Sequence, residues 1–90
     1  MKVRVKLPPI LQELSGGAET CEVSGQTVGD CLKSLEGQFP RIKDYLFDRQ
    51  GRLLAIFGIY LNSEGIYPVG LSTPVQGGDE IVILNFIMGG

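Results

Sequence analysis

The residues with the clearest chemical potential lie at the C-terminal end of the chain. An apolar stretch runs there into two glycines, Asn85-Phe86-Ile87-Met88-Gly89-Gly90. We expect the free carboxylate to be that of Gly90. Because glycine has no Cβ, a Gly-Gly tail fits through a channel too narrow for side chains and brings its carboxylate to a nucleotide held by a partner. We therefore expect a flexible tail over residues 86–90 that is a substrate for another protein. A frayed terminus without a role is the alternative.

The rest of the chain offers no catalytic constellation. There is no histidine, so Cys21 and Cys31 can assemble neither a zinc site nor a Cys–His nucleophile. Both cysteines fall in apolar registers and are expected as free thiols in the core. Asp79 and Glu80 are adjacent, so on a strand they point to opposite faces and suit a turn better than acid–base chemistry. We expect no metal site, no bound cofactor and no enzyme activity from the chain alone.

Length and composition limit the class of protein. The 90 residues predict a single domain, 1–90, and 43% hydrophobic residues are typical of a folded chain. A formal charge of −2 provides no net electrostatic attraction to nucleic-acid phosphates. No segment approaches the roughly twenty apolar residues that span a bilayer, and the N-terminus lacks the apolar stretch of a signal peptide. We expect a cytoplasmic protein with neither nucleic acid nor membrane as partner.

The N-terminal half predicts a hairpin followed by a helix. Residues 2–7 alternate basic and apolar side chains, which is typical of a half-buried strand. The basic row Lys2, Arg4 and Lys6 then shares one face, which faces solvent or an acidic partner. After a turn at residues 16–17, residues 20–24 alternate in the same way. Thr27 suits a helix N-cap, and apolar residues recur at helical spacing until Pro40 ends the helix.

The C-terminal half predicts two or three further strands. Residues 41–52 suit a connection that contains a turn of helix, and residues 53–61 form a strand covered on much of both faces. Residues 66–69 suit a short edge strand, and a turn at residues 77–79 precedes a strand over residues 80–86. The order β-β-α-β-β predicts an α+β fold of the β-grasp type, a mixed four- to five-stranded sheet with one main helix packed across it. The right-handed crossover places the last strand beside the first at the sheet centre.

Three segments resemble the MoaD/ThiS sulfur carriers, a family of ubiquitin-like β-grasp proteins, over nearly the full length of the chain. They are Thr27–Leu32 with Phe39-Pro40, Ile59–Asn62, and Gly78–Ile81 ahead of the terminal glycines. The resemblance implies that a ubiquitin-activating-type adenylating enzyme, using ATP and Mg, activates the carboxylate of Gly90. A sulfur donor protein then converts it into a thiocarboxylate. In the MoaD type the carrier is the small subunit of molybdopterin synthase and inserts its tail into the large subunit.

The resemblance leaves the acceptor of the sulfur open. Many MoaD-like tails have proline where this chain has Asn85, and a small residue where it has Met88. We take the molybdopterin route first, with thiamine, cysteine or tungsten-cofactor synthesis as alternatives. A ubiquitin-like modifier joined to lysine amines through Gly90 is a second possibility, and a β-grasp interaction module with an inert tail is a third.

The expected partner-binding residues flank the reacting end. Gly89 keeps the backbone slim beside the reacting carbon, and Phe86, Ile87 and Met88 are expected to anchor the tail on an apolar partner surface. Phe57 and Ile59 share one strand face and are expected to complete an exposed docking patch, with burial under the helix as the alternative.

Overall fold

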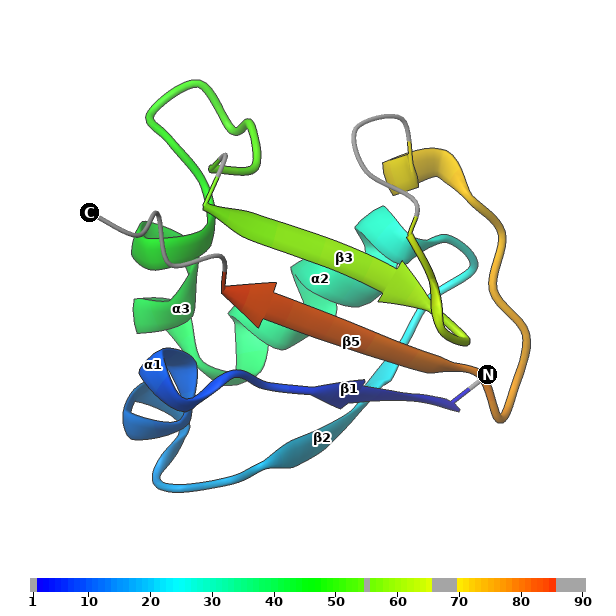
Figure 1. The fold of residues 1–90 in the computed structure, drawn as a ribbon, viewed down its shortest axis with the longest axis horizontal. Helices are drawn as coiled ribbons and strands as arrows, with labels where there is room; N and C mark the ends of the chain where they lie inside the picture. Colours follow the sequence, from blue (N-terminus) through cyan, green and yellow to red (C-terminus); the bar gives the residue numbers. More distant parts are fainter. Residues whose placement is uncertain (1, 55, 66–69, 86–90) are drawn as a thin grey trace.

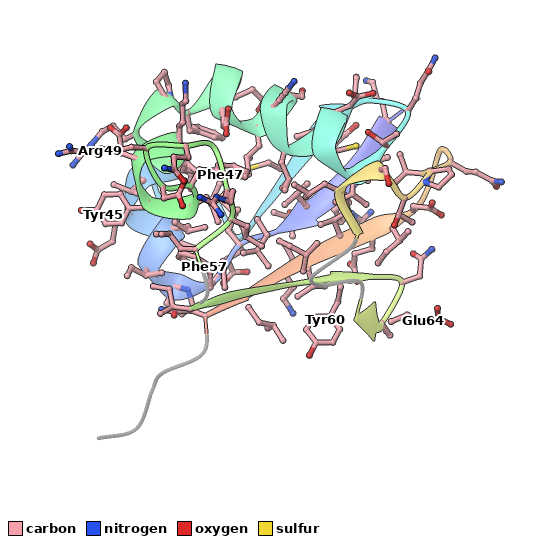
Figure 2. The ribbon with its side chains drawn as sticks, turned by 90° about the horizontal axis from the view of Figure 1, so that it is seen from above. Tyr45, Phe47, Arg49, Phe57, Tyr60 and Glu64 are labelled. Atoms are coloured by element: carbon pink, nitrogen blue, oxygen red, sulfur yellow. The ribbon has the colours of Figure 1, made fainter. Side chains whose placement is uncertain are left out.

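The computed structural model describes residues 2–54, 56–65 and 70–85, and within them five strands form one mixed sheet in the order β2-β1-β5-β3-β4. Helices α2 and α3 lie on one face of this sheet (Figure 1, Figure 2). The predicted α+β class and β-grasp arrangement are confirmed. The strands are β1 (Lys2–Lys6), β2 (Thr20–Ser24), β3 (Phe57–Leu61), β4 (Glu64–Gly65) and β5 (Glu80–Asn85). The helices are α1 (Pro9–Gln12), α2 (Val28–Gln38) and α3 (Pro40–Leu46), with 3-10 turns η1 (Glu13–Ser15) and η2 (Gly70–Ser72).

The predicted N-terminal hairpin is confirmed. Strand β1 pairs antiparallel with β2, with Val3 opposite Val23 and Val5 opposite Cys21. Those side chains are buried, whereas the residues between them on both strands are exposed. The alternation in the sequence therefore identified both the strands and their buried face.

The last strand lies at the centre of the sheet, as the crossover rule predicts. Strand β5 pairs parallel with β1 and antiparallel with β3. The chain therefore approaches its C-terminal tail from the central strand of the sheet.

The main helix begins where the sequence predicts. The Thr27 Oγ1 accepts a hydrogen bond from the backbone N–H of Asp30 at 3.1 Å, which caps one of the free donors of the first turn. The Asp30 carboxylate in turn accepts from the backbone N–H of Gln26 at 3.3 Å. Gly29 is required for close packing, because a Cβ there would lie 2.9 Å from the carbonyl oxygen of Leu71.

The connection after α2 contains more helix than a single turn. Residues 40–46 form α3, in which Pro40 occupies the first turn and Ile42 and Leu46 are buried. Proline suits that position because its fixed φ is already helical, and the two apolar residues are one turn apart on the same face. A short helix that the sequence analysis did not predict, α1, follows β1.

The strand predicted over residues 53–61 is shorter than expected. Strand β3 begins at Phe57, and Leu53 forms only an isolated bridge with Phe47. The backbone N–H of Phe57 donates to the carbonyl of Leu54 at 3.1 Å, so the chain turns immediately before the strand. The predicted edge strand over residues 66–69 lies outside the described residues. On the β3 side of the sheet, the edge strand that the structure describes is β4, at residues 64–65.

Two of the segments that carry the family resemblance meet at the start of β5. The Asn62 side chain donates to the Asp79 carboxylate at 3.1 Å and accepts from the backbone N–H of Glu80 at 2.9 Å. Asn62 has a φ of 49°, a left-handed conformation that asparagine tolerates better than most residues. The turn between β3 and β4 is thus fastened to the beginning of β5. We call these contacts the Asn62 latch.

The core lies between the sheet and the helices, and both cysteines belong to it. Cys21 and Cys31 are free and buried, as predicted. The buried apolar residues form one cluster: Val3, Val5, Leu7, Leu11, Cys21, Val23, Val28, Cys31, Leu32, Leu35, Ile42, Leu46, Phe57, Ile59, Val75, Ile81 and Ile83.

Candidate functional site

Strand β5 positions the C-terminal tail. Its ladder with β3 runs as far as the pair Phe57–Asn85, so the chain is held in the sheet up to Asn85. The predicted site residues Phe86, Ile87, Met88, Gly89 and Gly90 lie outside the described residues. What the structure describes is the surface beside the point where β5 ends.

That surface is apolar and open. Leu84 on β5 and Ile10 on α1 are 41% and 40% exposed, and both line a groove of about 510 Å³. Val82, two residues before Leu84 on the same strand, lies on the same wall. The other residues that line the groove are Lys6, Leu7, Pro8, Pro9, Gln12, Ile83 and Asn85. We call Ile10, Val82 and Leu84, with Lys6 at their rim, the exit surface.

The local sequence explains why these side chains meet. Pro8 and Pro9 end β1, since proline cannot donate to a strand ladder and suits the first turn of a helix. The chain therefore turns into α1 beside the end of β5, and Ile10 comes to lie against the groove. Ile56, directly before the Phe57–Asn85 pair at this end of the sheet, is also exposed. Tyr45 on α3 is a further exposed side chain (Figure 2).

The exit surface carries one positive charge that the sheet does not neutralise. Lys2, Arg4 and Lys6 are all exposed on one face, as the alternation predicts. The ammonium of Lys2 lies 3.8 Å from the carboxylate of Glu22, and Arg4 has Glu22 and Glu80 as its cross-strand neighbours. Lys6 instead lies between Thr20 and Val82, neither of which is acidic. An apolar groove with a cation at its rim suits an apolar partner surface that carries a carboxylate.

The prediction that Phe57 and Ile59 form an exposed docking patch is wrong. Both side chains are buried, at 0% and 2% exposed, and belong to the core cluster. Figure 2 shows Phe57 toward the helices and Tyr60 pointing away from them. Side chains alternate along a strand, so Phe57 and Ile59 share the face that the helices cover, and Tyr60 between Ile59 and Leu61 belongs to the open face.

The sequence analysis missed Ile10 and Leu84. Strand β5 reads Ile81-Val82-Ile83-Leu84, so both of its faces are apolar and the pattern alone does not distinguish the inner from the outer face. One signal was available: β1 has a basic outer face, and a strand paired with it must share that face. No comparable signal pointed to Ile10.

The two cysteines do not contribute to this surface. Burial raises the pKa of the Cys21 thiol, and burial followed by the nearby Asp30 carboxylate raises the pKa of the Cys31 thiol. The thiolate is the reactive form of cysteine, and both thiols are held protonated at neutral pH.

The described residues contain no group of three or more histidine, cysteine, aspartate or glutamate side chains that could hold a metal ion. Among their helices, none is long and apolar enough to cross a membrane.

Comparison with known proteins gives a family and full-length relatives. The model of the ThiS family matches residues 5–90. The Sulfur carrier protein CysO of Mycobacterium tuberculosis strain H37Rv is 34% identical, and the alignment covers 100% of both chains.

Solved structures of similar proteins have the same fold. SAMP1 from Haloferax volcanii superposes with a TM-score of 0.88 at 28% identity, covering 100% of both chains. A chain in the Amycolatopsis orientalis BexX/CysO complex superposes with a TM-score of 0.86 at 31% identity, covering 98% of this chain and 99% of that one.

Proposed function

The chain belongs to the ThiS family, and from that membership we propose that it carries sulfur on Gly90 as a thiocarboxylate. It is a sulfur carrier of the ThiS/MoaD type, and members of this family are small carriers rather than catalysts. The catalysis comes from partner proteins, which bind the exit surface and act on the tail. The match to the ThiS family is the observation that carries this proposal, and the open apolar groove directly beside the end of β5 supports docking of the partners there.

The proposed chemistry takes place in two steps on a partner. The Gly90 carboxylate oxygen attacks the α-phosphorus of ATP held with Mg by the adenylating enzyme, a P–O bond forms and pyrophosphate leaves. Hydrosulfide released by the donor then attacks the carbonyl carbon of the acyl-adenylate, a C–S bond forms, and AMP leaves with the oxygen. Loss of the S–H proton leaves the thiocarboxylate. The carrier contributes only the acyl group, which fits the lack of a catalytic constellation among its described residues.

The surface explains how such a partner distinguishes this carrier. Burying Ile10, Val82 and Leu84 against an apolar surface stabilises the complex, and Lys6 at the rim fixes its orientation through a carboxylate. Since Asn85 is still held in the β5–β3 ladder, docking on the exit surface fixes the point from which residues 86–90 start. Five extended residues reach roughly 17 Å, so the partner's nucleotide lies within that distance of Asn85.

For the acceptor of the sulfur we rank cysteine synthesis first and molybdopterin synthesis second. The full-length relative at 34% identity is named Sulfur carrier protein CysO, which supports the first. The resemblance of the motif segments to the MoaD type supports the second, in which the chain is the small subunit of molybdopterin synthase. A modifier role has one supporting observation of its own, the likeness to SAMP1, which stands for small archaeal modifier protein 1.

Intact mass spectrometry tests the proposal. The protein is incubated with an adenylating enzyme, ATP, Mg and a sulfur donor, and we expect the mass gain of one oxygen-to-sulfur exchange, mapped to the C-terminal peptide. An oxidised methionine gives nearly the same gain, so a variant lacking Gly89-Gly90 is the control and must stay unmodified. An unmodified tail with competent partners present contradicts sulfur transfer. Adducts on lysine amines instead support the modifier role.

A further inference from the structure

The edge strand β2 leaves a row of backbone groups that no other strand of the described residues pairs. It is the first strand in the sheet order, so only its β1 side carries a ladder. The Glu22 carbonyl and the Ser24 N–H form hydrogen bonds with side chains of α2, so both groups point away from β1. Backbone groups alternate in direction along a strand, so the N–H and carbonyl of Thr20 also point away from β1. An edge with such groups is a template for another strand.

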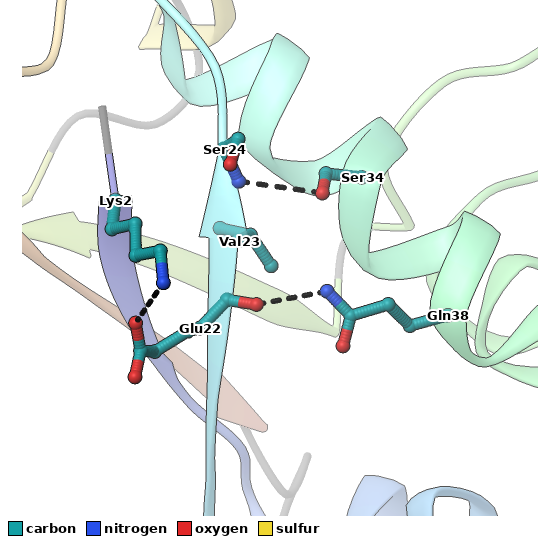
Figure 3. A pocket seen from close by; sticks show the side chains of 6 residues that line it. All are labelled: Lys2, Glu22, Val23, Ser24, Ser34 and Gln38. Atoms are coloured by element: carbon teal, nitrogen blue, oxygen red, sulfur yellow. Dashed lines mark hydrogen bonds and ion pairs between the residues drawn. The ribbon is translucent and has the colours of Figure 1, made fainter.

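Two side chains of α2 occupy this edge. The Ser34 hydroxyl accepts from the Ser24 N–H at 3.3 Å, and the Gln38 side-chain amide donates to the Glu22 carbonyl at 2.8 Å (Figure 3). Ser34 and Gln38 are four residues apart, so they lie on one face of the helix and reach successive outward positions of the strand. Together they pair the Glu22 carbonyl at the middle of β2 and the Ser24 N–H at its end.

The surface along this edge is otherwise hollow. One groove of about 270 Å³ is lined by Lys2, Glu22, Val23, Ser24, Ser34 and Gln38. A second, of about 560 Å³, is lined by Arg4, Thr20, Cys21, Glu22 and Gln38. Both grooves include Glu22 and Gln38, so the Gln38–Glu22 contact lies between two open stretches of the same edge. Removing that contact joins the stretches.

The outward positions of β2 are complementary to themselves. In an antiparallel pair of two β2 strands centred on Glu22, Thr20 of one copy lies opposite Ser24 of the other, and two hydroxyl side chains suit such a pair. Glu22 then faces Glu22, which is unfavourable, but each carboxylate has Lys2 at 3.8 Å and Arg4 on the neighbouring strand. The arrangement has the two-fold symmetry of most homodimers.

We propose that Ser34 and Gln38 close the β2 edge, and that without them this edge pairs antiparallel with β2 of a second copy of the chain. The closure keeps the protein monomeric and leaves docking to the other parts of its surface. The proposal is independent of sulfur transfer, because it involves no residue of the exit surface or the tail.

The test compares two double variants. Ser34→Ala with Gln38→Ala removes both contacts, whereas Ser34→Thr with Gln38→Lys keeps a hydroxyl and a donor at the same places. Sedimentation velocity over a concentration series is expected to show dimers for the alanine pair, with a dimer fraction about tenfold above that of wild type at equal concentration. The Thr/Lys pair is expected to sediment like wild type. If the alanine pair fails to fold by circular dichroism, Gln38→Ala alone takes its place.

Cross-linking identifies the surface that pairs. In the proposed dimer the two residues 22 lie in a hydrogen-bonded pair with Cα atoms about 5.5 Å apart, a distance that a disulfide spans. Glu22→Cys is therefore expected to oxidise to a covalent dimer in the alanine background and not in the wild-type background. Arg41→Cys, exposed on α3, is the matched control and should not cross-link in either.

Three results would overturn the proposal. The folded alanine pair could stay monomeric over the whole concentration range. Its dimer could fail to cross-link through residue 22, in which case pairing occurs elsewhere. Equal cross-linking in both backgrounds would show that the contacts from α2 do not close the edge.

Discussion

The two ends of β5 are built in opposite ways. At its beginning, polar groups bond to one another: the Asn62 latch joins the β3–β4 turn to Asp79 and the backbone of Glu80. At its end, Leu84 is open to solvent beside a groove, and the described ladder runs as far as Asn85. Directional bonds within the chain give rigidity, whereas an exposed apolar surface gains free energy only when a partner covers it. One end therefore anchors the strand, and the other presents an apolar surface to a partner.

Among the variants that test this difference between the two ends of β5, Leu84→Glu is expected to have the largest effect, on activation of the tail. A charge in the middle of the exit surface must be buried when the adenylating partner docks, so kcat/KM for activation of the tail should fall by about 10- to 100-fold. Unfolding free energy should change by less than about 1 kcal/mol, because Leu84 is exposed in the free protein. Steady-state kinetics and chemical denaturation measure the two quantities.

Leu71→Glu is the matched control for Leu84→Glu. Leu71 is also an exposed leucine, at 36%, but lies in η2 and does not line the groove. It should leave activation of the tail unchanged. Equal losses for the two variants would mean that the exit surface is not the docking site.

A smaller effect, on stability rather than activity, is expected from breaking the Asn62 latch. Asn62→Gly keeps the left-handed turn accessible but removes both side-chain hydrogen bonds, and should lower the unfolding free energy by about 1 kcal/mol. Asn62→Ala adds the cost of a left-handed backbone, roughly 1 kcal/mol more. Urea denaturation gives both values. Activation of the tail should be unaffected, and a loss of activation as large as that of Leu84→Glu would remove the distinction between the two ends.

The smallest expected effect is a pH dependence of the latch. A backbone hydrogen bond from Gln76, followed by the side-chain bond from Asn62, lowers the pKa of Asp79 below its ordinary value of 3.8. A carboxyl group with a lowered pKa in the folded state stabilises the fold above its unfolded pKa, and that contribution is lost as the pH falls through the folded pKa. Stability should therefore decline from near pH 3.8 downward.

Asp79→Asn isolates this contribution. The variant should be less stable than wild type at neutral pH and lose less stability on acidification, as measured by denaturation at a series of pH values. Asp48, whose pKa is lowered chiefly by the backbone N–H of Arg52, titrates in both proteins and cancels in the comparison. Parallel curves for the two proteins would show that Asp79 contributes nothing through its charge.

The sequence by itself determined the elements whose signals are local. The alternation of residues 2–6 fixed β1 and its buried face, and Thr27 with Pro40 fixed the limits of α2. The position of β5 beside β1 followed from the order of elements and the handedness of the crossover. The Gly-Gly end and the motif segments predicted the family, because these signals consist of consecutive residues.

Only the tertiary structure decided which apolar residues remain exposed. Strands β3 and β5 carry apolar side chains on both faces, so their periodicity does not say which face the helices cover, and Phe57 and Ile59 were assigned to the wrong one. Ile10 and Leu84 are 74 positions apart in the sequence and meet only because α1 packs beside the end of β5. The contacts of Ser34 and Gln38 with β2 are likewise long-range. The exposure of a side chain and the covering of a sheet edge depend on neighbours that folding brings together. A local sequence pattern therefore does not predict either of them.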